Sequence, residues 1–203
     1  MKFMKKINLG LILAIITIIA ITIYSICIYS QRSSEKEEIK KVCEDYISLV
    51  NKYSVLPERY QTIGESKKDI DLTQYYEEMK NEVSKYAKNG TTAELEFAQL
   101  KNNLEEEQLN TSKVKIQVDR EISKISSYDF DGNQVVVTFN QKVTVKQKYM
   151  QPDISAENIS EKINENVYES KGNMITLEKV DGSWKIVSSS LSYAEISNYA
   201  NMM

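Results

Sequence analysis

The chain has 203 residues, with 26 lysines and arginines against 29 aspartates and glutamates, no histidine, and a formal net charge of −3. Because histidine is the commonest general base and metal ligand, acid–base or metal chemistry here would have to rest on carboxylates. Three lysines precede a long apolar run, and the rest of the chain carries 23 basic against 29 acidic residues. This acidic balance argues against nucleic acid and anionic lipid headgroups as partners of the folded part.

Residues 9–29 form an apolar run that predicts a transmembrane helix. The 21 residues carry no charge, and at about 1.5 Å per residue they are long enough to cross a hydrocarbon layer of about 30 Å. A secretory signal has a shorter apolar region and a small-residue cleavage site, for which Ile28-Tyr29-Ser30 is a weak candidate. We expect a retained anchor that binds the membrane through Leu9 to Tyr29, with a cleaved signal as the alternative.

The charges on either side of the run predict its orientation. The short tail, residues 1–8, bears Lys2, Lys5 and Lys6, whereas four basic residues lie just beyond the run: Arg32, Lys36, Lys40 and Lys41. Large domains cross the membrane with little regard to charge, while a short lysine-rich tail tends to stay in the cytoplasm. We expect a single-pass protein of the cell membrane, with a cytoplasmic tail, a short linker at 30–34 and an extracytoplasmic domain at 35–199.

The two cysteines predict neither a disulfide nor a reactive thiol. Cys27 lies in the apolar run and Cys43 on a helix of the domain, so a bond within the chain would have to join membrane to domain. Ile26 is not the small residue that a lipoprotein site has before its cysteine, which favours an apolar, membrane-facing Cys27 over an acylated one. Cys43 could be a nucleophile, but without a histidine base a buried structural cysteine is the better interpretation.

Helical spacing of apolar residues predicts three helices in the first half of the domain. Ser34 to Glu37 has the form of a capping box, and apolar residues then recur every three or four positions up to Tyr53, before Pro57. A second helix is predicted at 71–87, with Gly90 as its stop, and a third at 91–109. Residues 54–70 are predicted to form a loop with one turn of helix.

After Asn110 the apolar period changes to two, which predicts two β-hairpins. Asp131-Gly132 is a type I′ turn dipeptide, and pairing outward from it sets Tyr128 against Val135 and Val118 against Val145. That register also places Lys124 opposite Phe139, so we expect a bulge or sharp bend within residues 122–127.

The second hairpin, residues 174–187, turns at Asp181-Gly182. Between the hairpins a polar stretch, residues 151–166, is expected to interrupt the sheet, with a short helix at 156–164. The second register pairs Leu177 with Ile186 and Lys179 with Trp184 on the core face. It pairs Glu178 with Lys185 on the other face, where we expect a cross-strand ion pair.

Helices followed by hairpins predict an α+β domain in which helices pack on an antiparallel sheet. Together with the closing hairpin MITLEKVDGSWKIVSSS, this order resembles the nuclear transport factor two-like superfamily over residues 35–191. The resemblance implies a curved sheet wrapped on helices as a cone, as in cystatin-like folds. That superfamily includes ketosteroid isomerases and also non-catalytic bacterial envelope domains on a single membrane helix, conjugation scaffold proteins among them.

Two acidic clusters are weighed as cation sites. Asp129, Asp131 and Asn133 alternate around Gly132, but the spacing of glycine and glutamate is not that of an EF-hand, so a hairpin turn is favoured. The run of glutamates at 105–107 is interpreted as a solvated helix face. We predict no metal site and no cofactor.

Aromatic residues of the domain could line a ligand pocket inside the cone, although packing in the core is the favoured interpretation. Asp119 is the nearest match to an isomerase base, but its position in the strand places it on the polar face with Lys113 and Gln117. We therefore predict no catalytic residue. The aromatic residues in question are Trp184, Tyr46, Tyr75, Tyr76, Tyr128 and Tyr149.

These patterns predict a non-catalytic, membrane-anchored interaction or scaffold module of a bacterial cell envelope, with other envelope proteins as partners. A bias toward Lys, Ile, Asn, Glu and Tyr is typical of AT-rich bacterial genomes. The first alternative is a small-molecule-binding or sensor domain that uses the cone pocket, its ligand being unidentified. The second is an enzyme with an unrecognised carboxylate site.

Overall fold

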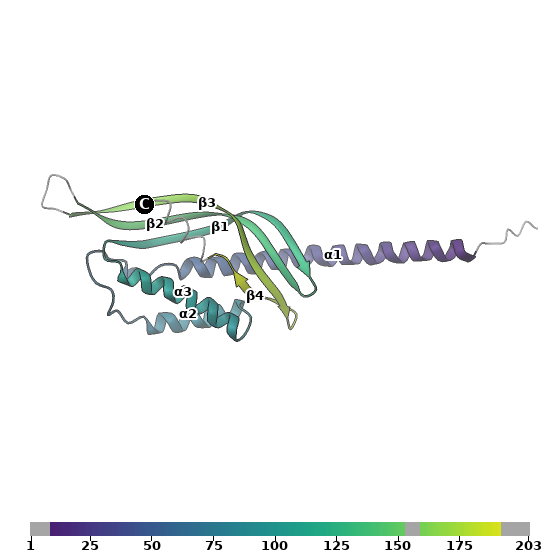
Figure 1. The fold of residues 1–203 in the computed structure, drawn as a ribbon, viewed down its shortest axis with the longest axis horizontal. Helices are drawn as coiled ribbons and strands as arrows, with labels where there is room; N and C mark the ends of the chain where they lie inside the picture. Colours follow the sequence, from purple (N-terminus) through teal and green to yellow (C-terminus); the bar gives the residue numbers. More distant parts are fainter. Residues whose placement is uncertain (1–8, 153–158, 192–203) are drawn as a thin grey trace, which may run out of the picture. The chain divides into compact units, whose positions relative to one another are not determined.

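The computed structural model describes residues 9–152 and 159–191, and it is an α+β protein (Figure 1). The chain divides into two compact units, Met1–Lys40 and Lys41–Met203. Helix α1, Leu9–Lys52, has residues in both units. In the second unit a short 3-10 turn and two helices precede four strands.

The described residues of the first unit, 9–40, belong to α1, and the apolar run forms most of them. Its isoleucines and leucines between residues 12 and 26 are exposed, and within the described residues it is the one helix long and apolar enough to cross a membrane. An N-terminal helix of this kind is consistent with a single membrane span or with a signal sequence.

A helix start at Ser34 is wrong, because α1 is continuous through this point and through residues 30–34, expected to be a linker. No glycine or proline occurs between residues 11 and 56, so nothing in the sequence breaks the helix. The Ser-x-x-Glu pattern of residues 34–37 therefore lies within α1 and does not form an N-terminal cap.

The other helices lie where the sequence predicts them. Helix α2 is Thr73–Tyr86 and α3 is Thr91–Leu109. Gly90 lies between them with a φ of +78°, a backbone conformation that glycine adopts without strain. One 3-10 turn, η1 at Glu58–Tyr60, interrupts the loop that follows α1, as expected.

The four strands form one antiparallel sheet in the order β1-β2-β3-β4, and Figure 1 shows α2 and α3 on one side of it. Their bounds are Lys113–Asp131, Gln134–Pro152, Ile159–Val180 and Ser183–Ser189. Strands β1 and β4 are its edges, so the described sheet is open, which does not establish the expected cone.

The predicted interruption at 151–166 is wrong for the described residues, because β2 continues to Pro152 and β3 already begins at Ile159. Residues 159–164 of the expected helix are strand, and residues 153–158 lie outside the described residues. Side chains at 161–165 are exposed on both faces. A strand with two solvated faces shows no period of two in its sequence, which explains the error.

The first hairpin has the predicted bulges, but its register near the turn differs. Its turn residues are Gly132 and Asn133, so Tyr128 lies opposite Val137 instead of Val135. Register shifts between Ile122 and Lys124 and between Ile125 and Ser127 remove the difference, and Val118 pairs with Val145 as predicted. Ile125, instead of Lys124, lies opposite Phe139.

The second hairpin has the predicted register, with Leu177 opposite Ile186 and Lys179 opposite Trp184. Asp181 and Gly182 both have positive φ, 49° and 82°, as a type I′ turn requires. The predicted ion pair between Glu178 and Lys185 is wrong. Although the two residues are cross-strand neighbours, the Glu178 carboxylate pairs with Lys88 Nζ at 2.9 Å, and Lys185 Nζ donates to the Lys85 carbonyl at 2.6 Å.

The core of the second unit lies between the helices and one face of the sheet. Odd-numbered residues of β2 from 135 to 145 are buried, while the even-numbered ones between them are half-buried or exposed. Strand β4 is also joined to the end of α2, because Lys88 N donates to the Ile186 carbonyl at 2.8 Å. The helices contribute these buried side chains to the core: Cys43, Tyr46, Val50, Met79, Val83, Leu100 and Leu104.

The contribution of this core to stability can be tested at Trp184. Its side chain is 4% exposed and meets Phe130 edge-to-face at 6.4 Å between ring centroids. Trp184→Ala should reduce the free energy of unfolding by about 3 to 5 kcal/mol, through lost burial and an unfilled cavity. Thermal unfolding of the detergent-solubilised chain, followed by circular dichroism, should show a midpoint lower by many degrees. Lys142→Ala, at an exposed position on the opposite face, should leave it nearly unchanged.

Candidate functional site

A buried carboxyl group lies in the core of the second unit. Glu96 of α3 is 5% exposed, and its Oε2 accepts hydrogen bonds from the hydroxyl groups of Tyr46 on α1 and Ser189 on β4, the latter at 3.2 Å. Three elements distant in the sequence therefore meet at one carboxyl group. We call these three residues the Glu96 cluster.

Burial determines the protonation of the Glu96 cluster. Removal of the Glu96 carboxyl from water raises its pKa, and the hydrogen bonds from Tyr46 and Ser189 only partly oppose this effect. Burial, and then the neighbouring Glu96, raise the pKa of Tyr46 well above its ordinary value. The cluster can hold a proton within the core, but with 5% of Glu96 exposed it offers little access to a substrate.

The burial of Glu96 has a signal in the sequence. The apolar residues of α3 that recur at spacings of three and four are Ala93, Phe97, Leu100 and Leu104. The buried residues of α3 are Glu96, Leu100, Leu104 and Glu107, a stripe rotated by one position. Since residues four apart share a helix face, Glu96 lies directly in line with Leu100 and Leu104.

The acidic run at 105–107 is only partly a solvated face. Glu105 and Glu106 are exposed, whereas Glu107 is 7% exposed, accepts a hydrogen bond from Lys115 N at 2.6 Å and lies 3.7 Å from Lys115 Nζ. Glu107 thus joins the end of α3 to the start of β1.

A second buried polar group joins α1 to β1. Arg120, 3% exposed, donates from Nη1 to Asn51 Oδ1 at 3.0 Å and to Ser54 Oγ at 3.1 Å. Asn51 also exchanges hydrogen bonds with the Arg120 backbone. Asp119, considered as an isomerase base, is half-buried and accepts a hydrogen bond from Asn51 Nδ2 at 3.4 Å. Alternation with Val118 and Ile122 along β1 places Arg120 on the core face, a signal that the sequence contains.

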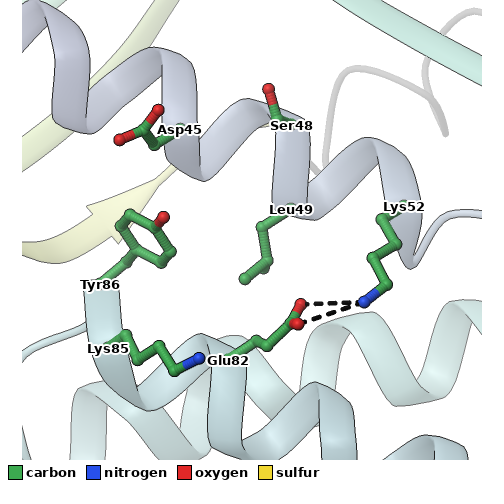
Figure 2. A pocket seen from close by; sticks show the side chains of 7 residues that line it. All are labelled: Asp45, Ser48, Leu49, Lys52, Glu82, Lys85 and Tyr86. Carbon is green, nitrogen blue, oxygen red and sulfur yellow. Dashed lines mark hydrogen bonds and ion pairs between the residues drawn. The ribbon is translucent and has the colours of Figure 1, made fainter.

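Figure 2 shows a surface groove of about 290 Å³ between the C-terminal part of α1 and helix α2. Leu49 and Tyr86 lie within it, and Lys52 closes one end by pairing with Glu82 at 3.2 Å and with Glu78 at 2.6 Å. Burial disfavours the charge of Lys52, but the hydrogen bonds with Glu78 and other neighbours outweigh this and raise its pKa. The ion pairs join two helices, and such partly exposed pairs contribute about 0.2 to 1 kcal/mol each.

Two other grooves lie against the sheet. One of about 420 Å³ is lined by Glu58, Gln61, Ile116 and Lys148. Another, of about 320 Å³, is lined by Ser123, Lys142, Val167, Tyr168 and Glu169. Both are open surface depressions in which charged groups alternate with apolar side chains.

The remaining candidates from the sequence, Cys43 and the acidic residues of the first hairpin turn, show the following surroundings. Cys43 is fully buried, and burial raises the pKa of its thiol to about 12, which keeps it protonated and weakly nucleophilic. Within residues 9–152 and 159–191 no group of three or more acidic or cysteine side chains could hold a metal ion. Asp129 accepts a hydrogen bond from Ser127 at 2.7 Å beside the hairpin turn.

The aromatic residues considered as a pocket lining pack within the fold. Trp184 and Tyr46 are buried, and Tyr75, Tyr76, Tyr128 and Tyr149 are half-buried. The Tyr75 hydroxyl donates to the carbonyl groups of Lys52 and Val55, at 3.2 and 3.1 Å. These contacts close the loop after α1 against α2.

Comparison of the chain with models of known protein families and with curated proteins found no match.

The protonation of Glu96 can be tested by its effect on stability. A folded-state pKa raised above the unfolded value of 4.5 means that the folded protein binds the extra proton. This stabilisation is complete below pH 4.5 and is lost as the pH rises through the folded pKa, with a slope of up to about 1.4 kcal/mol per pH unit. Glu96→Gln should remove that slope from urea unfolding curves measured across the pH range.

Glu94→Gln is the matched control, because Glu94 is exposed on the same helix and should leave the slope unchanged. An unaltered slope in Glu96→Gln would show that Glu96 is ionised in the folded protein.

Proposed function

We propose that this protein is a membrane-anchored, extracytoplasmic interaction or scaffold module of a bacterial cell envelope, and that it acts without catalysis. The observation that carries the proposal is the composition of α1. One continuous helix contains both the exposed apolar segment and, further along, Cys43, Tyr46 and Val50, which pack in the core of the second unit. A domain whose core includes part of its own anchor helix is built to be held at a membrane.

The packing of the sheet gives further support to a surface-based role. Tyr46, Phe139 and Leu100 fill the space between sheet and helices, and each is at most 2% exposed. The depressions of the described residues instead lie on the outside and carry charges of both signs. Such surfaces suit contacts with other proteins better than enclosure of a small molecule.

The finer details of fold and orientation are part of the same proposal. Long bent hairpins that follow helices support membership of the nuclear transport factor two-like group, with the open sheet as the wall of a cone. The lysine-rich tail supports a cytoplasmic N-terminus. The alternative function, a small-molecule sensor, would need an interior pocket, and the buried side chains named above occupy that space.

The orientation can be tested with fusions to the full chain. A reporter active only in the cytoplasm should be inactive when fused after Met203 and active when fused before Met1, because the three lysines of the tail favour its retention inside. A reporter active only outside the cytoplasm should give the opposite pattern. Strong cytoplasmic activity after Met203 would reverse the orientation.

The scaffold role predicts that tethering is essential. A secreted fragment of residues 31–203 should fail to complement a deletion strain, whereas the same residues on an unrelated single-span anchor should restore at least part of the phenotype. Confinement at a membrane raises the effective concentration of partners without new contacts, which a soluble fragment loses.

Interior substitutions supply the control for this experiment. Phe139→Leu in the full chain keeps the core apolar and leaves the exterior intact, so complementation should persist. Full complementation by the secreted fragment, or loss of function from one aspartate-to-asparagine change in a folded protein, would refute the scaffold role and favour an enzyme or sensor.

A further inference from the structure

The sheet face away from α2 and α3 carries a regular pattern of charge on the two inner strands, β2 and β3 (Figure 1). Lys142 and Lys146 of β2 lie directly opposite Glu169 and Glu165 of β3, and directly paired residues project to the same face. Lys146 and Glu165 are 3.5 Å apart, with 35% and 51% of their side chains exposed. We call these four residues the charge patch, which has a positive column on β2 and a negative column on β3.

The middle of the charge patch is uncharged. Thr144 pairs with Val167 there, and Val167 is 54% exposed. The depression of about 320 Å³ described above adjoins this pair, since Lys142, Val167 and Glu169 are among the residues that line it. This face therefore combines an exposed apolar side chain, space for a long side chain and charges of both signs, as protein contact surfaces do.

We propose that a second copy of the chain docks on this face, with a two-fold axis that runs parallel to the strands between β2 and β3. In a two-fold contact the same surface patch of each copy meets itself, so the patch has to be complementary to itself. This axis places β2 of one copy over β3 of the other. Each lysine of the charge patch then faces a glutamate of the second copy, and Val167 faces the second copy's Thr144.

The distance between packed sheets suits these contacts. Two sheets that pack face to face lie about 10 Å apart, a gap that a lysine and a glutamate side chain span together. Each charge then has one opposite charge beside it in its own chain and another above it in the second copy. The depression next to Val167 leaves room for the long side chains of the second copy.

The charges distinguish this axis from other symmetric ones. An axis along β2 would set each lysine of the charge patch against its own copy, and an axis along β3 would do the same with the glutamates. An axis across the strands at the level of Thr144 would set Lys142 against Lys146 of the second copy. Like charges that face each other across a contact are destabilising, so these three arrangements are disfavoured.

An axis between β1 and β2 is the nearest competitor. It would set Lys142 against the second copy's Glu121, but Lys146 against the uncharged Gln117. Val167 would also lie outside the contact, because β3 is not part of it. The axis between β2 and β3 therefore gives more ion pairs and includes the exposed valine.

The proposed contact rests on residues of the sheet alone and does not require the anchoring or orientation proposed above. One exposed valine and four charged residues per copy form a small, polar contact, so we expect a reversible dimer and not a permanent one. Anchoring in one membrane would favour it, because confinement raises the effective concentration of the two copies.

Charge-swapped variants of the full chain test the contact. Glu165→Lys with Glu169→Lys makes the charge patch wholly positive, and Lys142→Glu with Lys146→Glu makes it wholly negative. Each variant alone should self-associate about tenfold or more weakly than the wild type, because like charges then face each other. A mixture of the two variants should associate at least as strongly as the wild type. Energy transfer between fluorescent fusions, measured over a range of concentrations in detergent, reports all of these associations.

A matched control reverses two exposed glutamates on the helices, Glu77→Lys with Glu106→Lys, and so makes the same change of net charge away from this face. It should self-associate like the wild type. Association in the mixture also shows that both charge-swapped variants are folded. Val167→Lys, at an exposed position, is an independent variant that should weaken self-association, because it adds a positive charge beside the lysines of the second copy.

Three results would overturn the proposal. The first is no energy transfer between wild-type chains at the highest soluble concentration. The second is equal self-association of the wild type and all variants, which would place the contact on another surface, such as α1. The third is a mixture that stays monomeric while the wild type associates, which would show that the charges of the patch act only within one chain.

Discussion

The bend of the sheet is the constraint on which the second unit depends. Strands β1 to β3 contain 19, 19 and 22 residues, several times the usual strand of about five or six. A straight sheet of this length would extend beyond the helices, so its ends could not pack against them. The register shifts of β1 next to Ile125 and the shift between β2 and β3 next to Phe139 are adjacent, because Ile125 pairs with Phe139 and Phe139 with Asn173. Bulges aligned across three strands bend the whole sheet along one line, so residues on both sides of the line, such as Val143 and Ile175, are buried.

Buried polar groups occur where elements meet, and each satisfies backbone or side-chain groups that the packing would otherwise leave unpaired. At the bend, Gln141 Nε2 donates to Asn173 Oδ1 at 3.2 Å, and Asn173 Nδ2 donates to the Ser170 carbonyl at 3.0 Å. Glu96 performs the same role between α1, α3 and β4, and Arg120 between α1 and β1. Loss of one partner from such a group costs about 1 to 3 kcal/mol in unsatisfied polarity. These contacts therefore favour one arrangement of helices on the sheet over others of similar hydrophobicity.

The sequence correctly predicted those elements that depend on a few neighbouring residues. The helical spacing of α2, the turn at Asp181-Gly182 and the bulge near Ile122 all act within a few residues, and each was located from the sequence, whereas Gly90, expected to stop α2, is instead the residue before α3. The first hairpin turn lies one residue later than predicted. Gly132 and Asn133 form its loop, and only Gly132 has a positive φ. The bulges further from the turn restored the predicted pairing. The identity of the turn residues alone does not predict such a change of register along the strands.

The buried polar groups were harder to predict for a different physical reason. Glu96 and Arg120 are charged types that almost always lie at the surface, so an analysis based on hydrophobicity excludes them from core stripes even where the helical or strand period includes them. Their burial depends on partners 50 and 69 residues away, Tyr46 and Asn51. Sequence spacing alone does not identify such partners.

The charges on the sheet face away from the helices limit how a partner could recognise it. Lys146 lies 3.5 Å from Glu165, and by register Lys142 lies between Glu121 on β1 and Glu169 on β3. Neighbouring opposite charges cancel beyond about one Debye length, roughly 8 Å at physiological salt, so this face produces little long-range steering of a charged partner. Recognition there would depend on short-range fit and on apolar contact area. The proposed tethering would suit such a surface, because a partner confined to the same membrane would not need electrostatic steering to meet it often.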